Sequence, residues 1–191
     1  MASTYTPLGV EKMATGENAG TWGTKTNTNL ELIEQISGGY KVQTLNTAGS
    51  GANTTTLSKS DGATGATVAT RVIILGAVSP EAITGAKIVT LPVLTENFYL
   101  IKNSTSGSYT VQLKAASGSG ATVTWATTDK GWKIVYFDGV TTNTGVYDTG
   151  FGSDTDPGGS TTQVQYNNAG AFDGDADLIW TAGTGLTINS Q

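Results

Sequence analysis

The sequence of 191 residues has no cysteine and no histidine, and only 13% of its residues are charged. Without cysteine, the chain can form neither a disulfide framework nor a cysteine-ligated zinc site. The usual Ser-His and Cys-His catalytic arrangements are also excluded, because each of them needs a histidine. The charged fraction is about half of the roughly 25% that soluble domains contain. The chain is therefore poor in the side chains that most enzymes use.

Positive charge is scarce as well. The ten lysines and arginines stand singly along the chain, and the net charge is -5. Nucleic-acid binding and electrostatic binding to anionic membranes both need clustered basic residues, so we expect neither. Long apolar runs are missing too, and a membrane-spanning helix needs about 18 such residues. The first ten residues lack the basic start and apolar stretch of a secretory signal, so we expect assembly in a cytoplasm.

Small polar residues take the place of charge, above all threonine, glycine, serine and asparagine. Threonine favours strands, whereas the other three favour turns. Short candidate strands follow one another across residues 40–150, separated by turn sequences such as Asp138-Gly139. Even spacing of this kind predicts a β-sandwich or barrel, so we expect a mainly β fold. The candidate strands are 41–47, 54–58, 67–75, 86–91, 98–103, 109–115, 122–126, 132–137 and 140–147.

Two of these strands differ in their side-chain pattern. Residues 109–115 alternate apolar and polar side chains, which predicts one face toward the core and one toward water. Residues 132–137 are apolar on both faces, which indicates a central strand. Trp125 and Trp132 lie inside candidate strands, so the simplest expectation is that both belong to the core.

The first 39 residues form a separate region with an extended arm, 1–24, and a predicted helix, 25–37. The side chains of Leu30, Leu32, Ile33 and Ile36 project to one broad side of this helix. So short a helix is marginal alone, so its stability must come from packing. Two interpretations stay open: the apolar side covers the β-domain of the same chain, or it packs against symmetry mates.

Trp22 is the large aromatic of a lead that is otherwise rich in glycine and threonine. Tryptophan and tyrosine dominate binding hot spots, which favours a docking role for Trp22. The alternative is local packing of Trp22 against Leu30 or Ile33. We predict a partner-docking set of Tyr5, Leu8, Met13, Trp22, Leu30, Ile33 and Ile36.

The C-terminal part begins with a linker, 151–162, rich in glycine, serine and aspartate. Three short candidate strands follow, at 163–166, 177–180 and 186–188. A unit of this size cannot make its own core. We therefore expect either that the natural chain continues or that other copies bury this unit.

Three parts of the sequence resemble tail fibre proteins of tailed bacteriophages, especially those of marine phages and cyanophages. The first comprises residues 5–13 and the run Gly20-Thr-Trp-Gly-Thr-Lys-Thr-Asn-Thr-Asn29. The second comprises residues 98–120 and the run Lys133-Ile-Val-Tyr-Phe-Asp-Gly139, and it is similar to a β-domain common in phage tail proteins. The third, residues 159–172, is similar to the repeat that opens many fibre shafts.

This resemblance implies a structural virion protein that anchors a fibre to the phage tail for host adsorption. It implies a homotrimer whose first region docks on tail proteins of the nozzle, adaptor or hub type. Residues 163–191 would begin a β-rich trimeric shaft, and a host receptor would be bound only by more distal fibre parts.

The acidic residues allow two other kinds of site to be considered. Paired carboxylates can cleave glycosides, but the acids here lie mostly on the predicted helix or in turns, where aspartate has ordinary structural roles. The run Asp173-Gly-Asp-Ala-Asp177 resembles the start of a calcium loop, but Leu178 and Thr184 occupy the positions that need glycine and glutamate. A solvated turn is the better interpretation, and we predict no catalytic, metal or cofactor site.

Three alternatives to the fibre remain open. The first is a free-standing β-sandwich module that binds glycans, the second is a capsid decoration protein, and the third is a glycan-cleaving enzyme.

Overall fold

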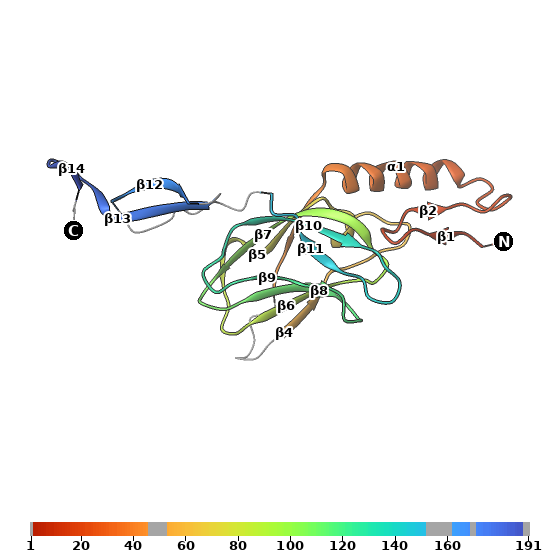
Figure 1. Cartoon of the computed structure of the whole chain (residues 1–191). Helices are drawn as coiled ribbons and strands as arrows, with labels where there is room; N and C mark the ends of the chain where they lie inside the picture. Colours follow the sequence, from red (N-terminus) through yellow and green to blue (C-terminus); the bar gives the residue numbers. More distant parts are fainter. Residues whose placement is uncertain (1, 46–52, 152–161, 169–170, 189–191) are drawn as a thin grey trace. The chain divides into compact units, whose positions relative to one another are not determined.

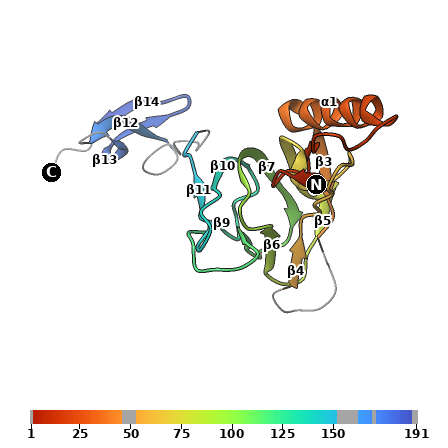
Figure 2. The same ribbon diagram turned by 90° about the vertical axis from the view of Figure 1, so that its right-hand side faces the viewer.

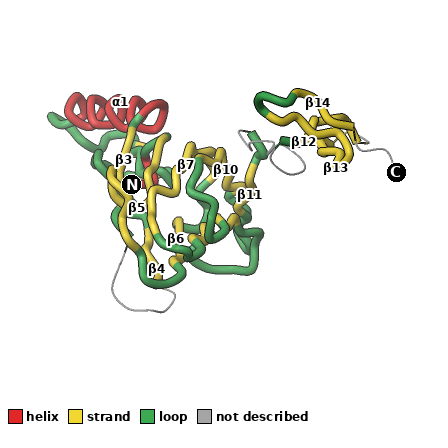
Figure 3. Tube along the Cα trace, turned by 90° about the vertical axis from the view of Figure 1, so that its left-hand side faces the viewer, coloured by secondary structure: helices red, strands yellow, loops and turns green. Residues whose placement is uncertain are grey.

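The computed structural model describes residues 2–45, 53–151, 162–168 and 171–188. The chain divides into two units, Met1–Gly152 and Ser153–Gln191 (Figure 1). Most of the described secondary structure is strand, with one α-helix, α1 (Trp22–Gly38), and a single turn of 3-10 helix, η1 (Thr67–Ala69). Figure 3 separates the helix from the strands by colour. The prediction of a mainly β fold is confirmed.

The first unit is built around two sheets. One has five strands in the order β11-β10-β7-β5-β3, and the other has four in the order β4-β6-β8-β9. The strands are β3 (Tyr40–Gln43), β4 (Asn53–Thr56), β5 (Val72–Ala82), β6 (Lys87–Leu91), β7 (Glu96–Ser106), β8 (Val111–Ala115), β9 (Val123–Trp125), β10 (Trp132–Asp138) and β11 (Val146–Asp148).

From β3 to β8 the chain alternates between the two sheets (Figures 1 and 2). The strands β3, β5 and β7 run parallel in one sheet, and β4, β6 and β8 run parallel in the other. Parallel neighbours need a crossover connection, and here each crossover passes through the opposite sheet instead of a helix. The strands β9, β10 and β11 then add in antiparallel fashion.

One apolar core lies between the two sheets and draws side chains from both of them. Tyr99 and Phe137 meet edge to face in this core, with ring centroids 5.8 Å apart and an interplanar angle of 88°. The Tyr99 hydroxyl donates a hydrogen bond to the Val68 carbonyl over 2.9 Å, and burial raises the pKa of Tyr99 to about 12. The strand β8 has the predicted alternation, since Val111, Leu113 and Ala115 are buried and the residues between them are half-buried.

Several predicted boundaries were wrong, three of them in ways that change the element. The helix begins at Trp22 instead of residue 25, and the first part of the predicted strand 67–75 is η1. In the predicted strand 140–147, only the last two residues fall in β11. The preceding loop folds round Asp138, whose carboxylate accepts hydrogen bonds from the backbone N–H groups of Val140 and Gly145. These two bonds also lower the pKa of Asp138.

The expected extended arm 1–24 contains a small hairpin. The strands β1 (Thr4–Tyr5) and β2 (Glu11–Lys12) pair in antiparallel fashion. Hydrogen bonds from Thr6 N–H to the Val10 carbonyl and from Gly9 N–H to the Thr6 carbonyl, both 2.9 Å, close the connection between them.

The second unit is an antiparallel three-stranded sheet of β12 (Gln163–Asn168), β13 (Ala171–Thr181) and β14 (Gly185–Ile188). These elements contain all three predicted strands. The run 173–177, predicted to be a solvated turn, lies inside β13 instead. The predicted linker falls mostly outside the described residues.

Candidate interaction surfaces

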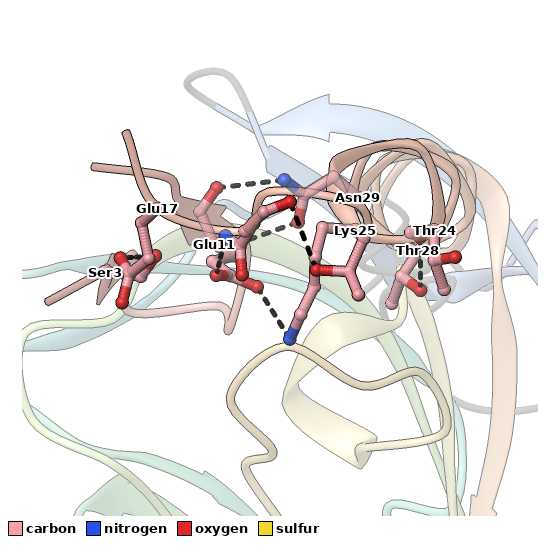
Figure 4. Close-up of polar contacts among 9 residues, drawn as sticks. Ser3, Glu11, Glu17, Thr24, Lys25, Thr28 and Asn29 are labelled. Carbon is pink, nitrogen blue, oxygen red and sulfur yellow. Dashed lines mark hydrogen bonds and ion pairs between the residues drawn. The ribbon is translucent and has the colours of Figure 1, made fainter. Parts of the chain in front are cut away.

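The N-terminal hairpin is attached to α1 by a cluster of polar side chains (Figure 4). The side-chain amide of Asn29 accepts a hydrogen bond from the Glu11 N–H and donates one to the Glu11 carbonyl, each 2.9 Å long. The Glu11 carboxylate pairs with the Lys25 ammonium at 3.1 Å and accepts a hydrogen bond from Asn18 at 3.2 Å. Glu11 is therefore a buried anchor between the hairpin and the helix.

Electrostatics reinforce this attachment. Ser3 and then Lys25 are the main causes that lower the pKa of the Glu11 carboxyl. The Glu11 carboxylate in turn raises the pKa of Lys25. Both shifts favour the ionised pair over a wide pH range.

The hairpin also contacts the β-domain, by which we mean the two sheets of the first unit and their loops. The backbone N–H of Gly62 donates to the Gly9 carbonyl over 2.7 Å. Gly9 has a φ of +89° and lies so close to Ser60 that an added Cβ would collide with the Ser60 carbonyl oxygen. The ring of Tyr5 lies beside Gly62. These contacts fix the hairpin between the helix and the β-domain.

The inner side of α1 covers part of its own domain. Leu32 is fully buried with Ala66 and Ala69, and Val10 and Ile36 pack against this cluster. The Gln35 side chain continues the contact, because it donates to the carbonyls of Ala66 and Ala69 at 3.2 and 2.9 Å and accepts from Gly65 N–H at 2.9 Å.

The predicted docking residues therefore divide into two groups. Leu8 and Ile36 are half-buried, and Ile36 belongs to the inner side of the helix. The exposed group includes the side chain of Trp22, 65% exposed, so close packing of Trp22 against Leu30 or Ile33 does not cover it. The exposed members are Tyr5, Met13, Trp22, Leu30 and Ile33.

A second exposed surface lies on the outer side of the five-stranded sheet. Side chains alternate across a strand, and since Tyr99, Val135 and Phe137 point into the core, their neighbours point outward. In one row across four strands, Tyr40 pairs with Val72, Val72 with Leu100 and Leu100 with Ile134. We call this outer surface the aromatic sheet face; its exposed aromatics are Tyr40, Phe98, Trp132, Tyr136, Tyr147 and Phe151.

The outer side of the four-stranded sheet has a different character. Its outward positions include Thr54, Gln112, Lys114 and Thr124. Polar side chains of this kind need no cover. The two sheets thus differ, and only the five-stranded one presents an apolar outer surface.

One end of the aromatic sheet face contains a cavity of about 200 Å³. Its lining residues are Leu100, Trp132, Lys133, Ile134 and Phe151. The Lys133 ammonium lies 3.1 Å from the carboxylates of both Asp129 and Asp148. Burial lowers the pKa of Lys133, but these two carboxylates outweigh it and raise the pKa overall. The cavity lining is thus mainly apolar, because the Lys133 ammonium lies 5.9 Å from the ring centre of the buried Trp125, on the other side of the strand.

Cations lie over two rings of the same face. The Arg71 guanidinium lies 3.9 Å from the centre of the Phe98 ring, and the Lys102 ammonium lies 5.9 Å from that of Trp132. Lys102 is the register partner of Trp132, so it lies at the cavity end of the face. Glu96 and Asp138, also paired in register, lie at the opposite end of the same two strands.

The sheet of the second unit has an apolar side with no core beneath it. Trp180 pairs with Leu186 and Leu178 with Ile188 in register, so these four side chains share one face. Trp180, Leu186 and Ile188 are 57%, 53% and 70% exposed. Among the side chains that the structure describes between 162 and 188, none is buried.

The sequence did not predict the aromatic sheet face. Trp125 is buried as expected, but Trp132, also assigned to the core, is 48% exposed. Residues 132–137 are apolar on both faces of the strand, and this pattern could have indicated the aromatic sheet face. An apolar outer face of a sheet needs a partner to cover it.

The described ranges contain neither a cluster of metal ligands nor a membrane-spanning helix. No three His, Cys, Asp or Glu residues gather there closely enough to hold a metal ion. Among the same residues, no helix has the length and hydropathy that crossing a membrane requires. A scan of protein-family models, a search of curated proteins and a search of solved structures found no significant match to this chain.

Proposed function

We propose that this protein is a structural virion protein, the proximal part of a phage tail fibre that anchors the fibre to the tail for host adsorption. Its mechanism is assembly, not catalysis. The single observation that carries the proposal is the second unit, whose sheet leaves Trp180, Leu186 and Ile188 exposed. An exposed apolar face of this kind marks an interaction site, and in this proposal other chains cover it.

A homotrimer supplies those chains. Three copies of residues 163–188, placed side by side, turn three exposed apolar faces into one shared core, which suits the start of a fibre shaft. The order of the segments that resemble tail fibre sequence supports the same assignment. The host receptor is then bound by more distal fibre parts.

The N-terminal region is the proposed attachment site for a tail protein of the nozzle, adaptor or hub type. Figure 1 places the hairpin and the start of α1 at the same end of the first unit. Tyr5, Met13 and Trp22 are exposed there. The contacts of Glu11 and Gly9 hold this region in place before any partner binds, which lowers the entropy cost of docking.

Incorporation of variants into phage particles tests this attachment. We expect Trp22→Ala to leave the β-domain folded but to reduce the amount of the protein in purified particles, because a large aromatic anchor is lost. Val140→Ala is the matched control, since Val140 is 49% exposed but lies in a loop of the β-domain. Equal incorporation of the two variants would contradict the docking role of Trp22.

Glycan binding is the second candidate function. The exposed rings of Trp132 and Phe151 favour it, because they border a cavity. The cavity has few of the polar groups that usually orient a ligand, so we rank it second. Titration of the intact chain on a glycan array tests it, and specific saccharide binding lost in Trp132→Ala would favour it over a purely structural role.

A further inference from the structure

The aromatic sheet face is close in size to a protein interface. Six aromatic side chains of roughly 200 Å² each, about half exposed, present about 600 Å² of surface. Monomeric proteins rarely expose an apolar patch beyond about 300–600 Å², and a stable interface buries about 800 Å² on each partner. With the half-buried Val72, Leu100 and Ile134 between the rings, the face approaches the size that a stable contact needs.

The helix α1 of the same chain does not cover this face. Gln35 attaches α1 to residues 65–69, and Glu11 attaches it to the hairpin. Tyr40, Phe98 and Trp132 all stay exposed in its presence. An occupant must therefore come from elsewhere.

The outer side of α1 has a matching character. Ile33 and Glu34 follow Leu30 by three and four residues, so each of them neighbours Leu30 on the helix surface. Leu30 and Ile33 are 59% and 51% exposed, and Glu34 is exposed as well. Within the described part of the chain, Glu34 has no ion pair, whereas Lys25, the sole cation of α1, is taken by Glu11.

Charge and shape then favour a pairing between the two surfaces. The helix face is apolar with an acidic side chain, and the cavity end of the aromatic sheet face is apolar with Lys102 beside it. The cavity of about 200 Å³ can accept an aliphatic side chain such as that of Ile33.

We propose that Leu30, Ile33 and Glu34 of one copy bind the cavity end of the aromatic sheet face of a second copy. Ile33 enters the cavity, and Glu34 lies beside Lys102. Since the two surfaces differ, the contact is heterologous, and its repetition closes a ring if the rotation allows. This inference rests on the proposed homo-oligomeric fibre and names the contact that joins its first units.

Cysteine cross-linking of the intact chain tests this contact. The sequence has no cysteine of its own, so only the introduced cysteines can form cross-links. We expect a double variant, Ile33→Cys with Phe151→Cys, to form covalent oligomers under mild oxidation or with a short bis-maleimide. The ladder should end at the number of copies in the ring. Each single variant should stay at the mass of one chain, and Ile33→Cys with Thr124→Cys is the control on the polar sheet.

Three results would overturn the inference. These are cross-linking of Phe151→Cys with itself, cross-linking within one chain only, and no cross-linking in an oligomeric chain. Light scattering of the unmodified chain gives its oligomeric state. This measurement distinguishes failure of the proposed contact from failure of the proposed function. If the chain is an oligomer but residues 33 and 151 do not cross-link, only the proposed contact is contradicted. If the chain is a monomer, the proposed homo-oligomeric fibre is contradicted as well.

Charge reversal gives an independent readout. In the double cysteine variant, Glu34→Lys and Lys102→Glu should each lower the rate of cross-linking by roughly two- to five-fold, which is the effect of losing an exposed ion pair. The two reversals combined in one chain should restore it. Failure of the combination to restore cross-linking, with each single variant folded, would contradict the placement of Glu34 beside Lys102.

Discussion

Asn29 of α1 holds the main chain of Glu11 with both ends of its amide group, accepting from the N–H and donating to the carbonyl over 2.9 Å each. A side chain thus completes the edge of the strand that contains Glu11, in the way that another strand would. This pairing joins the first hairpin to the helix.

Asn29→Ala should release the hairpin from the helix. Two half-buried hydrogen bonds are lost, at about 1 kcal/mol each, so we expect the free energy of unfolding of the hairpin to fall by about 2 kcal/mol. Faster amide hydrogen exchange of Glu11 and Val10 would report this. Asn27→Ala, an exposed change on the same helix, is the control, and equal exchange rates in the two variants would contradict the role of Asn29.

The attachment of the hairpin should weaken in acid. The folded pKa of Glu11 lies below its ordinary value, so its contribution to stability is fully present above the unfolded pKa. This contribution is lost as the pH falls through the folded pKa. Hydrogen exchange of the hairpin, measured between neutral pH and pH 3 relative to β8, should report this loss.

Glu11→Gln should remove that pH dependence while keeping the main-chain bonds to Asn29. If the variant retained the same acid transition in the hairpin, another group would have to be responsible. Lys25 behaves in the opposite sense, because its folded pKa is raised. Its contribution to stability is fully present below the ordinary lysine pKa and is lost only as the pH rises above that value.

Gly9→Ala should separate the hairpin from the β-domain. The added methyl group would collide with the Ser60 carbonyl, in addition to the strain of a φ of +89°. Gly16→Ala is a close control, since Gly16 has a φ of +80° but open space around it. We expect thermal unfolding to show a larger destabilisation for Gly9→Ala than the roughly 1–2 kcal/mol that the backbone conformation costs both variants. Equal destabilisation would mean that contact with Ser60 has no effect.

Trp180→Ser should lower the oligomeric mass of the chain without changing the unfolding of the first unit. Trp180 faces Leu186 across β13 and β14, and both are exposed within one chain. Light scattering measures the mass, and Thr181→Ser, an exposed change on the next residue, is the control. An unchanged mass in Trp180→Ser would place the contacts between copies elsewhere.

Local patterns predicted the character of the strands better than their partners. The alternation of 109–115 correctly indicated the buried face of β8, because that pattern depends on one strand alone. The parallel pairing of β3, β5 and β7 was not predicted, since it depends on where each crossover returns. Trp132 was assigned to the core because an apolar face does not reveal whether its own chain covers it.

The N-terminal region shows a similar limit. Residues 1–24 have no strand periodicity, and their hairpin is held by Asn29 and Gly62, which follow much later in the sequence. The prediction of exposed docking residues is compatible with Trp22, Leu30 and Ile33. Ile36, in contrast, is half-buried on the inner side of the helix. It packs against the cluster of Leu32, Ala66 and Ala69.

The most direct test of the proposed function is immunogold electron microscopy of phage particles purified from a source that carries the gene for this chain, with an antibody against residues 53–151. We expect label at the tail, at the point where fibres attach. Label on the capsid would contradict the fibre and favour a decoration protein, and particles without label would contradict a virion role altogether.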